Sequence, residues 1–360
     1  MAWTRFYCDI GAHVCEPETS VLEVMARMDK VTPYLFQVVI DQDKRVLGTV
    51  TDGDIRRALL RGESVSSRVA NSMKSDPIVG TDGDQTDNED KIRQMSLLRT
   101  SIVFMPLLDK QKRLSRILVL EHASFDRATA LVMAGGKGLR LGRRTRNMPK
   151  PLLEVGGRPM LDHVLEQLET AGIQRIFVSV NHLAEKIADF LANRQSESSI
   201  HMITESEMLG TAGAIGLLPE IDSGPLLVLN GDVLSDVNFQ GMLDFHQRHG
   251  LEATVGAAHY EYEVPFGVIK HDQNGAFEGV SEKPRQRYYV SAGINVLSAS
   301  IRGLVPRGQY LNMPDLLNSG REAGLKIGLY PIHEYWTDLG RPTDLETARP
   351  PVHRAKKSGP

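Results

Sequence analysis

A glycine-rich, basic stretch at residues 131–151 limits what this chain can fold into more than any other feature. An apolar run, Ala130 to Met133, leads directly into segment 134–138, in which three of five residues are glycine. This pattern is typical of a β-strand entering a loop whose backbone N–H groups can approach a phosphate closely. Basic residues follow at Arg140, Arg143, Arg144, Arg146 and Lys150. The sequence therefore predicts a polyphosphate cradle, although the glycines alone would favour an ordinary turn before a solvated basic face.

Two other glycine loops are excluded by spacing. The dinucleotide pattern G-x-G-x-x-G fails because Leu141 stands where its last glycine is required. The Walker pattern fails because no Gly-Lys-Ser/Thr ends the loop. A nicotinamide-dependent oxidoreductase is therefore disfavoured.

Composition indicates a reduced, soluble protein of two or three domains. The chain has 360 residues and a formal net charge of −3, so the overall charge does not indicate a nucleic-acid partner. Its two cysteines, Cys8 and Cys15, are too few for a disulfide framework or a cysteine metal site. The first fifteen residues lack a signal-peptide core, and no apolar run approaches the roughly 18 residues of a membrane span. We expect a cytoplasmic protein without a membrane partner.

The first 128 residues contain a repeated module. Each copy is predicted to contain a helix, a strand, a turn and a second strand, and an offset of 68 residues aligns the two copies, with Asp41 matching Asp109 and Val46 matching Leu114. Ser20 to Glu23 reads as a capping box that begins the first helix. The short passage 121–127 then joins the second copy to the glycine-rich strand, which implies direct contact between the two parts of the chain.

The remaining chain alternates strands and helices. Apolar positions 161, 164, 165 and 168 predict an amphipathic helix, residues 176–180 a buried strand, residues 183–191 a helix and residues 199–203 another strand. This alternation predicts an α/β domain with a mostly parallel sheet, whose ligand lies beyond the carboxyl ends of the strands. The expected domains are the first repeat at 1–68, the second repeat at 69–128 and the α/β domain at 129–349. A disordered tail is expected at 350–360.

The glycine-rich stretch and the residues after it resemble the sugar-1-phosphate nucleotidyltransferases. That family has G-G-x-G-T-R-L, then P-K-P-L, then G-x-P followed by an aliphatic residue, and this chain has the last two at 149–152 and 157–160. The departures are Leu139 in place of a hydroxyl residue and Arg143-Arg144 where the family often has Pro-Leu. The resemblance implies a Rossmann-like catalytic domain at about 130–348. It also implies nucleotide binding by Met133, Ala134, Gly135, Gly136, Gly138, Arg140, Lys150, Glu205, Gly210 and Asp232.

Two aspartates end apolar segments in this domain. Asp232 follows the run 226–229, and Asp338 lies within Trp336 to Gly340. An aspartate after glycine at a strand end is commonly a turn. The pair nevertheless resembles the family motifs L-x-G-D and W-x-D-x-G, whose aspartates hold magnesium. Because Mg²⁺ is usually held by one or two carboxylates together with water and phosphate oxygens, the resemblance implies Mg²⁺ bound by Asp232 and Asp338.

Further segments resemble the family's sugar-binding motifs. Segment 266–269 resembles Y-G-V, segment 280–284 resembles E-K-P, and segment 291–296 resembles the A-G-I-x-V strand that lines the sugar. On residues alone, Glu-Lys-Pro would be a solvated turn. The resemblance implies that sugar-phosphate contacts come from Gly267, Glu282, Lys283 and Asn295.

Gly48 to Ile55 in the first repeat closely resembles the end of a cystathionine-β-synthase (CBS) domain, which has G-x-V-T-x-x-D. The family's threonine and aspartate hold an adenine nucleotide, which implies that Thr51 and Asp54 bind a regulatory nucleotide here. Equally, Asp54 can simply cap the following helix. The second copy has Val119 and His122 at these positions and therefore lacks the ligand chemistry.

The resemblance implies transfer of a nucleotide from a nucleoside triphosphate to a sugar 1-phosphate, with release of pyrophosphate, which would supply activated sugar for surface glycans. Arg140 and Lys150 would neutralise the triphosphate and Lys283 would hold the attacking phosphate. Glu205 occupies the family's base-reading position. Because a carboxylate can accept the two adjacent donors of guanine, GTP is expected, with glucosamine, mannose or heptose 1-phosphate as the sugar substrate. The alternatives are a uridylyl- or thymidylyltransferase and a non-catalytic nucleotide-sensing regulator. A homo-oligomer is also expected.

Overall fold

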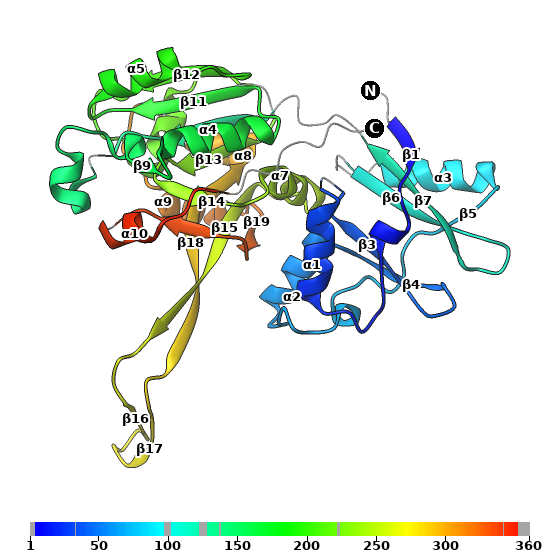
Figure 1. Cartoon of the computed structure of the whole chain (residues 1–360). Coiled ribbons are helices and arrows are strands. Elements are labelled where there is room, and N and C mark those ends of the chain that lie inside the picture. The colour runs from blue at the N-terminus through cyan, green and yellow to red at the C-terminus, as the bar shows by residue number, and fades with distance from the viewer. Residues whose placement is uncertain are drawn as a thin grey trace.

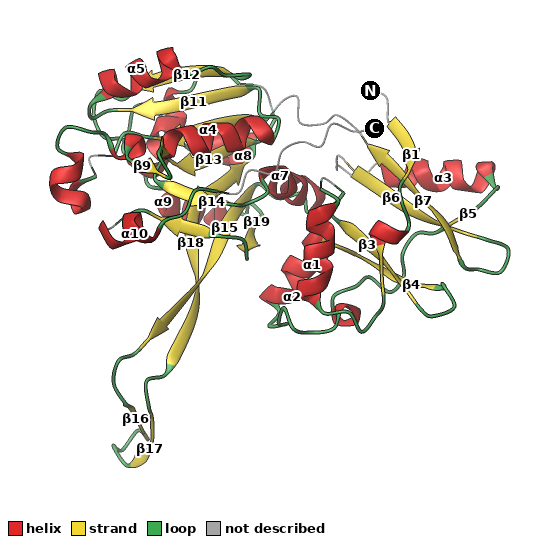
Figure 2. Cartoon of the chain, viewed as in Figure 1, coloured by secondary structure: helices red, strands yellow, loops and turns green. Residues whose placement is uncertain are grey.

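The computed structural model describes residues 4–32, 34–96, 102–121, 128–136, 138–221, 224–340 and 342–351. The N-terminal part consists of two small sheets with their helices, and the C-terminal part is a larger α/β domain from which a long β-ribbon projects (Figure 1). Figure 2 shows the helices packed on both faces of the large sheet. Within the described residues, no helix has the length and apolar character required to cross a membrane.

The first repeat forms a three-stranded sheet covered by two helices. Its elements are β2 (Val14–Cys15), α1 (Val21–Lys30), β3 (Phe36–Ile40), β4 (Val46–Thr51) and α2 (Asp52–Leu60). β2 is parallel to β3, and β3 is antiparallel to β4. Ser20 caps α1 as predicted, accepting a hydrogen bond from the Glu23 backbone N–H at 3.2 Å. The Glu23 side chain pairs with Arg27.

The second repeat has the same strand pairing and one helix in its described residues, and it confirms the offset of 68 residues. Its elements are β5 (Gly80–Thr81), α3 (Gln85–Ser96), β6 (Ile102–Leu108) and β7 (Leu114–Glu121), and β1 (Thr4–Tyr7) adds to β7. The turn residues Lys44 and Lys112 share the left-handed conformation, with φ of 63° and 61°. Phe36 and Phe104 stack with ring centroids 3.8 Å apart. The two copies therefore pack through equivalent residues. His122 and the joining passage 122–127 lie outside the described residues.

The C-terminal domain is built on a seven-stranded sheet of order β12-β11-β8-β13-β18-β15-β19. Its strands are β8 (Thr129–Met133), β9 (Glu154–Val155), β10 (Arg158–Pro159), β11 (Arg175–Val180), β12 (Ser199–Thr204), β13 (Leu226–Asn230), β14 (Val233–Ser235), β15 (Ala253–Glu263), β16 (Val268–His271), β17 (Phe277–Ser281), β18 (Arg285–Leu297), β19 (Ile327–Ile332) and β20 (Trp336–Asp338). Its helices are α4 (Met160–Thr170), α5 (Ala184–Asn193), α6 (Gly210–Gly213), α7 (Phe239–Arg248), α8 (Ala299–Arg302), α9 (Met313–Glu322) and α10 (Pro342–Thr347), with 3-10 helices at Leu139–Thr145, Lys150–Leu152 and Ala214–Leu217.

The predicted α/β fold with a mostly parallel sheet is confirmed. Strands β12, β11, β8 and β13 are mutually parallel, as are β15 and β19, and only β18 runs antiparallel to its neighbours. The central strands are continuous apolar runs because both faces of the sheet are covered. One apolar cluster packs α4 and α7 against one face, and a second packs α9 against the other.

Strands β15 and β18 extend beyond the sheet. The first six residues of β15 are buried and its last five are exposed, and the exposed residues pair with the first residues of β18. The hairpin β16–β17 continues this ribbon to its tip (Figure 1). We call residues 259–289 the arm. From the sequence, only segments 266–269 and 280–284 were assigned here, by their resemblance to sugar-binding motifs; the strands and their projection from the domain were not predicted.

Candidate functional site

Asp232 and Asp338 are brought together, as predicted, at the carboxyl end of the parallel sheet. Asp232 follows β13 by two residues, and Asp338 ends β20, where it pairs in register with Val233 of β14. The backbone N–H of Leu339 donates to the Asp232 carbonyl oxygen at 3.1 Å. The β14–β20 pairing thus holds two carboxylates from distant parts of the sequence side by side.

Lys150 lies between the two carboxylates. Its Nζ forms an ion pair with Asp232 and lies 3.7 Å from Asp338 Oδ1, and the Lys150 side chain is buried. The sequence expectation assigned Lys150 to the triphosphate; in the structure its charge is already engaged by the two aspartates. A phosphate that enters this cluster would therefore compete with the two aspartates for Lys150. A cation would compete with Lys150 for the two aspartates.

Asp338 is electrostatically unusual. Burial and the neighbouring Asp232 carboxylate raise its pKa above the ordinary aspartate value, while Lys150 and Arg140 oppose this increase. Asp338 Oδ1 is buried and has no hydrogen-bond partner among the described residues. Buried oxygens without a partner are rare and call for a ligand or another explanation. Asp232 and Asp338 are accordingly the two residues that could hold a cation here.

The glycine loop adjoins this cluster. Met133 at the end of β8 pairs in register with Asn230 at the end of β13, and the Gly231 N–H donates to the Met133 carbonyl oxygen at 2.9 Å. Gly138 has φ of 61°, and a Cβ there would lie 2.9 Å from the Thr145 side chain. No atom lies within 4 Å of a Cβ built on Gly136. The space beside Gly136 is therefore open, which is compatible with the cradle interpretation; Lys137 lies outside the described residues.

Arg140 also lies beside the carboxylates. Its guanidinium packs against Gly340, where a built Cβ would be 3.2 Å from Nη1, and its charge acts on Asp338. The side chains of Leu139 and Arg143, two departures from the family pattern, lie outside the described part of the chain. The site therefore combines two cations and two carboxylates at one sheet edge.

Glu205 is buried at the floor of the loop. Only 5% of it is exposed, which excludes a merely solvated side chain. One carboxylate oxygen accepts a hydrogen bond from the Ser179 hydroxyl, and the other accepts one from the Leu209 backbone N–H at 3.0 Å. A Cβ on Gly135 would lie 3.0 Å from Glu205 Oε1, so the carboxylate borders the cradle. Each carboxylate oxygen can accept a second hydrogen bond.

Gly210 completes this loop. Its φ is 78°, and a Cβ there would meet the Leu311 carbonyl oxygen at 2.6 Å. Only glycine fits such a close approach in the left-handed region. Residues Ser179 and Asn181, which support Glu205 from β11 and the turn after it, were missed by sequence reasoning because isolated polar residues at a strand end carry no distinctive pattern.

The predicted sugar-phosphate residues are not all brought to this site. Gly267 and Glu282 lie together on the arm, since a Cβ on Gly267 would be 3.0 Å from Glu282 Oε2, and Lys283 follows directly. Figure 1 shows that hairpin β16–β17, which these residues flank, projects away from the sheet. No described atom of Lys150, Asp232 or Asp338 is in polar contact with them. Lys283 therefore has no described polar contact with the carboxylate cluster, and its assignment to the sugar phosphate stays a prediction.

Asn295 lies inside the large sheet. It pairs with Val228, two residues before the end of β13, and is buried with no hydrogen-bond partner for Oδ1 among the described residues. Its position in the middle of the strand is set back from the edge at which Asp232 lies. Gly293 lies closer to that edge, against the Asn230 side chain.

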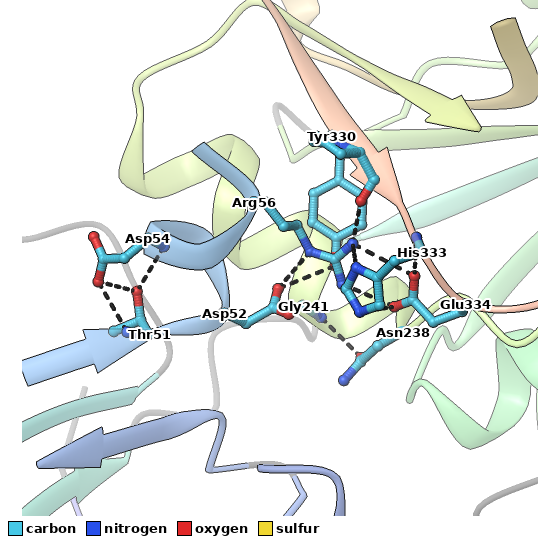
Figure 3. Close-up of polar contacts among 10 residues, drawn as sticks. Thr51, Asp52, Asp54, Arg56, Asn238, Gly241, Tyr330, His333 and Glu334 are labelled. Carbon is cyan, nitrogen blue, oxygen red and sulfur yellow. Dashed lines mark hydrogen bonds and ion pairs between the residues drawn. The ribbon is translucent and has the colours of Figure 1, made fainter. Parts of the chain in front are cut away.

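Thr51 and Asp54 form a reciprocal capping box at the start of α2. The Thr51 hydroxyl accepts from the Asp54 N–H at 3.2 Å, and Asp54 Oδ2 accepts from the Thr51 N–H at 2.9 Å (Figure 3). The helix therefore begins at Asp52, with Thr51 as its N-cap and Asp54 in the third position. The capping interpretation is correct, and it does not exclude ligand binding, because both residues also line a cavity.

That cavity lies between the two repeats and the α/β domain and has a volume of about 470 Å³. Phe104 and Ile102 line it from the second repeat, and Asp244, Arg248 and His249 line it from α7 and the residue that follows. Arg248 Nη2 also donates to the Ile102 carbonyl oxygen at 3.1 Å. This volume falls within the range of small-molecule sites.

A buried ionic cluster joins α2 to the end of β19, and sequence reasoning did not find it. Arg56 is 1% exposed; its Nε lies 2.6 Å from Asp52 Oδ2 and its Nη2 lies 2.8 Å from Glu334 Oε1. Its guanidinium carbon lies 3.8 Å from the Tyr330 ring centroid (Figure 3). Burial alone would raise the pKa of Glu334, but the charge of Arg56 outweighs it and lowers that pKa to about 2.

An α/β domain with an open glycine loop and paired carboxylates at the carboxyl edge of its sheet defines a nucleotide-binding enzyme. Residues 129–354 match the family model for nucleotidyl transferases, and the chain belongs to that family. Residues 9–61 match the CBS domain, in agreement with the first repeat.

Curated proteins similar to this chain include guanyltransferases. The chain is 35% identical to the mannose-1-phosphate guanyltransferase of Pichia angusta over 228 residues, which cover 60% of this chain and 61% of that protein. It is 31% identical to the mannose-1-phosphate guanylyltransferase catalytic subunit beta of Drosophila melanogaster over 237 residues, 61% of each. The chain thus spans about three fifths of the length of these relatives. The crystal structure of HddC from Yersinia pseudotuberculosis complexed with GMP-PN is 25% identical, with a TM-score of 0.48, and the match covers 61% of this chain and 96% of that one.

Proposed function

We propose that the protein is a sugar-1-phosphate guanylyltransferase, which converts GTP and a sugar 1-phosphate into a GDP-sugar and pyrophosphate. The observation that carries the proposal is the cluster of Lys150, Asp232 and Asp338 beside the open glycine loop. A sugar-phosphate oxygen would attack the α-phosphorus of GTP, and the bond from that phosphorus to the departing pyrophosphate oxygen would break. No protein nucleophile takes part, because catalysis of phosphoryl transfer is mostly positioning and charge neutralisation.

Backbone N–H groups of the glycine loop would bind the triphosphate, and Arg140, which lies beside Asp338, would neutralise its charge. Asp232 and Asp338 would hold Mg²⁺, which is compatible with the buried Asp338 Oδ1, an oxygen without a hydrogen-bond partner among the described residues, and with a cation that needs only one or two carboxylates. Bound there, Mg²⁺ supplies positive charge to the phosphates. Lys150 would hold the two carboxylates close together until the phosphates arrive.

Pyrophosphate release tests this function. Each of the four common nucleoside triphosphates is offered with a panel of sugar 1-phosphates. The first is mannose 1-phosphate, because the similar curated proteins are named for it. Glucosamine and heptose 1-phosphates follow. Release that requires GTP, a sugar 1-phosphate and Mg²⁺ together supports the proposal, and absence of release from every pair would reject it in favour of a non-catalytic nucleotide sensor.

The base preference is expected to depend on Glu205. Wild-type protein should favour GTP over UTP and dTTP by about ten- to a hundredfold, because a two-oxygen acceptor matches the adjacent donors of guanine. Glu205→Gln should reduce that ratio, although the side chain keeps nearly the same size. Ser179→Ala is the matched control, since it removes the internal hydrogen bond to Glu205 but keeps the carboxylate. Equal loss of preference in both variants would mean that Glu205 only supports the loop.

We also propose that the cavity at Thr51 and Asp54 binds an adenine nucleotide. Calorimetry on the full chain should detect weak binding of AMP or ATP, and Asp54→Ala should weaken it at least about tenfold through loss of a charged hydrogen-bond acceptor. Because Asp54→Ala also removes a helix cap, Ser20→Ala serves as control: it removes the cap of α1, which does not line the cavity. Unchanged binding in Asp54→Ala would leave this residue with the capping role alone.

A further inference from the structure

Helix α7 of the α/β domain forms one wall of the cavity between the domains. The lining includes Asp244 and Arg248 of this helix and His249, which follows it. The helix also packs on the large sheet through Met242 and Leu243, which are buried, so it lies between that sheet and the first repeat (Figure 1). The rest of the lining comes from the two repeats, from the segment between them and from residues just before α7. A ligand in the cavity would therefore touch the repeats and the α/β domain at the same time.

The ionisable residues of the cavity wall carry an excess of positive charge. Three cations line it: Arg57, Lys74 and Arg248. Three carboxylates also line it: Asp52, Asp54 and Asp244. Asp52 is balanced by Arg56, which does not line the cavity and whose Nε lies 2.6 Å from Asp52 Oδ2. The charges that remain in the wall are three cations and two carboxylates, which favours an anionic ligand.

His249 gives independent evidence for a positive potential at this wall. Its Nδ1 donates to the Phe245 carbonyl oxygen at 2.7 Å and its Nε2 accepts from Arg57, so the ring is neutral. Burial lowers the pKa of His249 below its ordinary value, against the effect of the hydrogen bond to Phe245. The charges of Arg57, Arg248 and Lys326 lower that pKa further. Three cations therefore act on one point of the wall, which is the electrostatic setting of an anion site.

Two arginines cross the junction between the repeats and the α/β domain in opposite directions. Arg57 of the first repeat contacts Asp54 on its own helix and His249 on the α/β domain. Arg248 of α7 donates through Nη2 to the Ile102 carbonyl oxygen of the second repeat at 3.1 Å. A guanidinium has five N–H donors in a planar fork, which suits the oxygens of a phosphate group. Both arginines line the cavity, so a phosphate there can meet a guanidinium from each side of the junction.

The second repeat supplies an apolar wall to the same cavity. Met95, Val103 and Phe104 line it, and the Phe104 ring is stacked on Phe36. The planar face of a base can pack on such a wall, and the Asp54 carboxylate can accept hydrogen bonds from ribose hydroxyls. Apolar surface, carboxylate and cations thus match the base, the ribose and the phosphate of a nucleotide.

We propose that α7 is part of this binding site and that Arg248 contacts the phosphate of the bound nucleotide. Arg57 and Lys74 complete the phosphate contacts, while the ribose lies at Asp54. The nucleotide thus spans the junction between the first repeat and the α/β domain, whereas the motif at Thr51 and Asp54 implied ligand contacts from the first repeat alone. This inference rests on the proposed adenine-nucleotide site and adds to it the residues that recognise phosphate.

A comparison of AMP with adenosine tests the phosphate contact. The two ligands are titrated into the full chain and followed by ligand-observed NMR, which detects weak binding. Wild type should bind AMP at least about tenfold more tightly than adenosine, because hydrogen bonds between charged groups are stronger than neutral ones. Arg248→Gln should remove most of this difference by weakening AMP binding, and should leave adenosine binding unchanged. Arg248→Lys keeps the charge and should retain part of the difference.

Lys326→Gln is the matched control. Lys326 also lies beside His249, whose carbonyl oxygen accepts from Lys326 Nζ at 2.7 Å, but it does not line the cavity. The variant loses the same charge and should keep the wild-type preference for AMP. Only binding that Asp54→Ala weakens is assigned to the cavity, which separates it from binding at the glycine loop.

The outcomes distinguish this inference from the proposals on which it rests. If Arg248→Gln keeps the wild-type affinity for AMP, or weakens AMP and adenosine equally, Arg248 does not contact the phosphate and the inference is wrong. If wild type binds AMP and adenosine equally, the site does not recognise phosphate. If wild type binds neither ligand, the proposed nucleotide site fails and this inference fails with it. Pyrophosphate release from the same preparations decides the transferase function separately.

Discussion

Replacing either Asp232 or Asp338 with asparagine should lower turnover by on the order of a hundredfold or more, because each change removes a charge on which the phosphates and Mg²⁺ depend. The two variants should differ in stability. Asp232→Asn leaves the buried Lys150 with only the more distant Asp338, at 3.7 Å, and should destabilise the fold. Asp338→Asn removes a charge that burial and the Asp232 carboxylate disfavour, as the raised pKa of Asp338 indicates, and this variant should unfold no earlier than wild type.

The measurements are steady-state pyrophosphate release over a range of Mg²⁺ concentrations and urea unfolding of the same preparations. Asp236→Asn is the matched control, because Asp236 follows β14 but pairs with Arg349 at 2.6 Å and not with Lys150. It should keep near-normal turnover. If the Asp232 or the Asp338 variant keeps near-normal turnover, the replaced aspartate is not a ligand of Mg²⁺.

The sheet edge that carries Asp232 and the glycine loop was predictable because the sequence patterns that indicate it are local. Strands buried on both faces must be continuous apolar runs, so 130–133 and 226–229 identify β8 and β13 without tertiary information. Parallel strands end at the same edge, which places the glycine loop and Asp232 together. The position of Lys150 between two aspartates depends instead on how the turns after β8, β13 and β19 fold over one another. Periodicity does not encode that arrangement.

The arm and the ionic cluster at Arg56 escaped prediction for a related reason. Alternating Tyr and Glu from residue 260 onward indicates a strand with two different faces, but not whether the domain covers the tyrosine face. Arg56 and Arg57 are adjacent on a short amphipathic helix and look equivalent in sequence. The structure buries the first between domains and leaves the second 37% exposed, because only Arg56 faces β19.

Arg56→Met should lower the free energy of unfolding by about 3–5 kcal/mol, the usual cost of breaking a buried ion pair and leaving its partner charged. It would leave Asp52 and Glu334 without their buried cation, and it would also remove the contact with the Tyr330 ring. Arg57→Met is the control from the same helix. Its pair with Asp54 and its contact with the His249 ring are both only part-buried, so the loss should be clearly smaller, about 1 kcal/mol.

The pH dependence of this loss identifies its cause. Arg56 lowers the pKa of Glu334 to about 2, below its ordinary value of 4.5, so the ion pair stabilises the folded protein fully above pH 4.5 and loses its effect as pH falls toward 2. The difference between wild type and Arg56→Met should therefore be largest near neutral pH and shrink below pH 4.5. Urea unfolding followed by the fluorescence of Trp336, two residues from Glu334, measures it. Arg56→Met combined with Glu334→Gln should recover part of the loss, because no unpaired carboxylate remains at position 334. If Arg56→Met and Arg57→Met unfold at the same urea concentration, the cluster does not hold the two domains together.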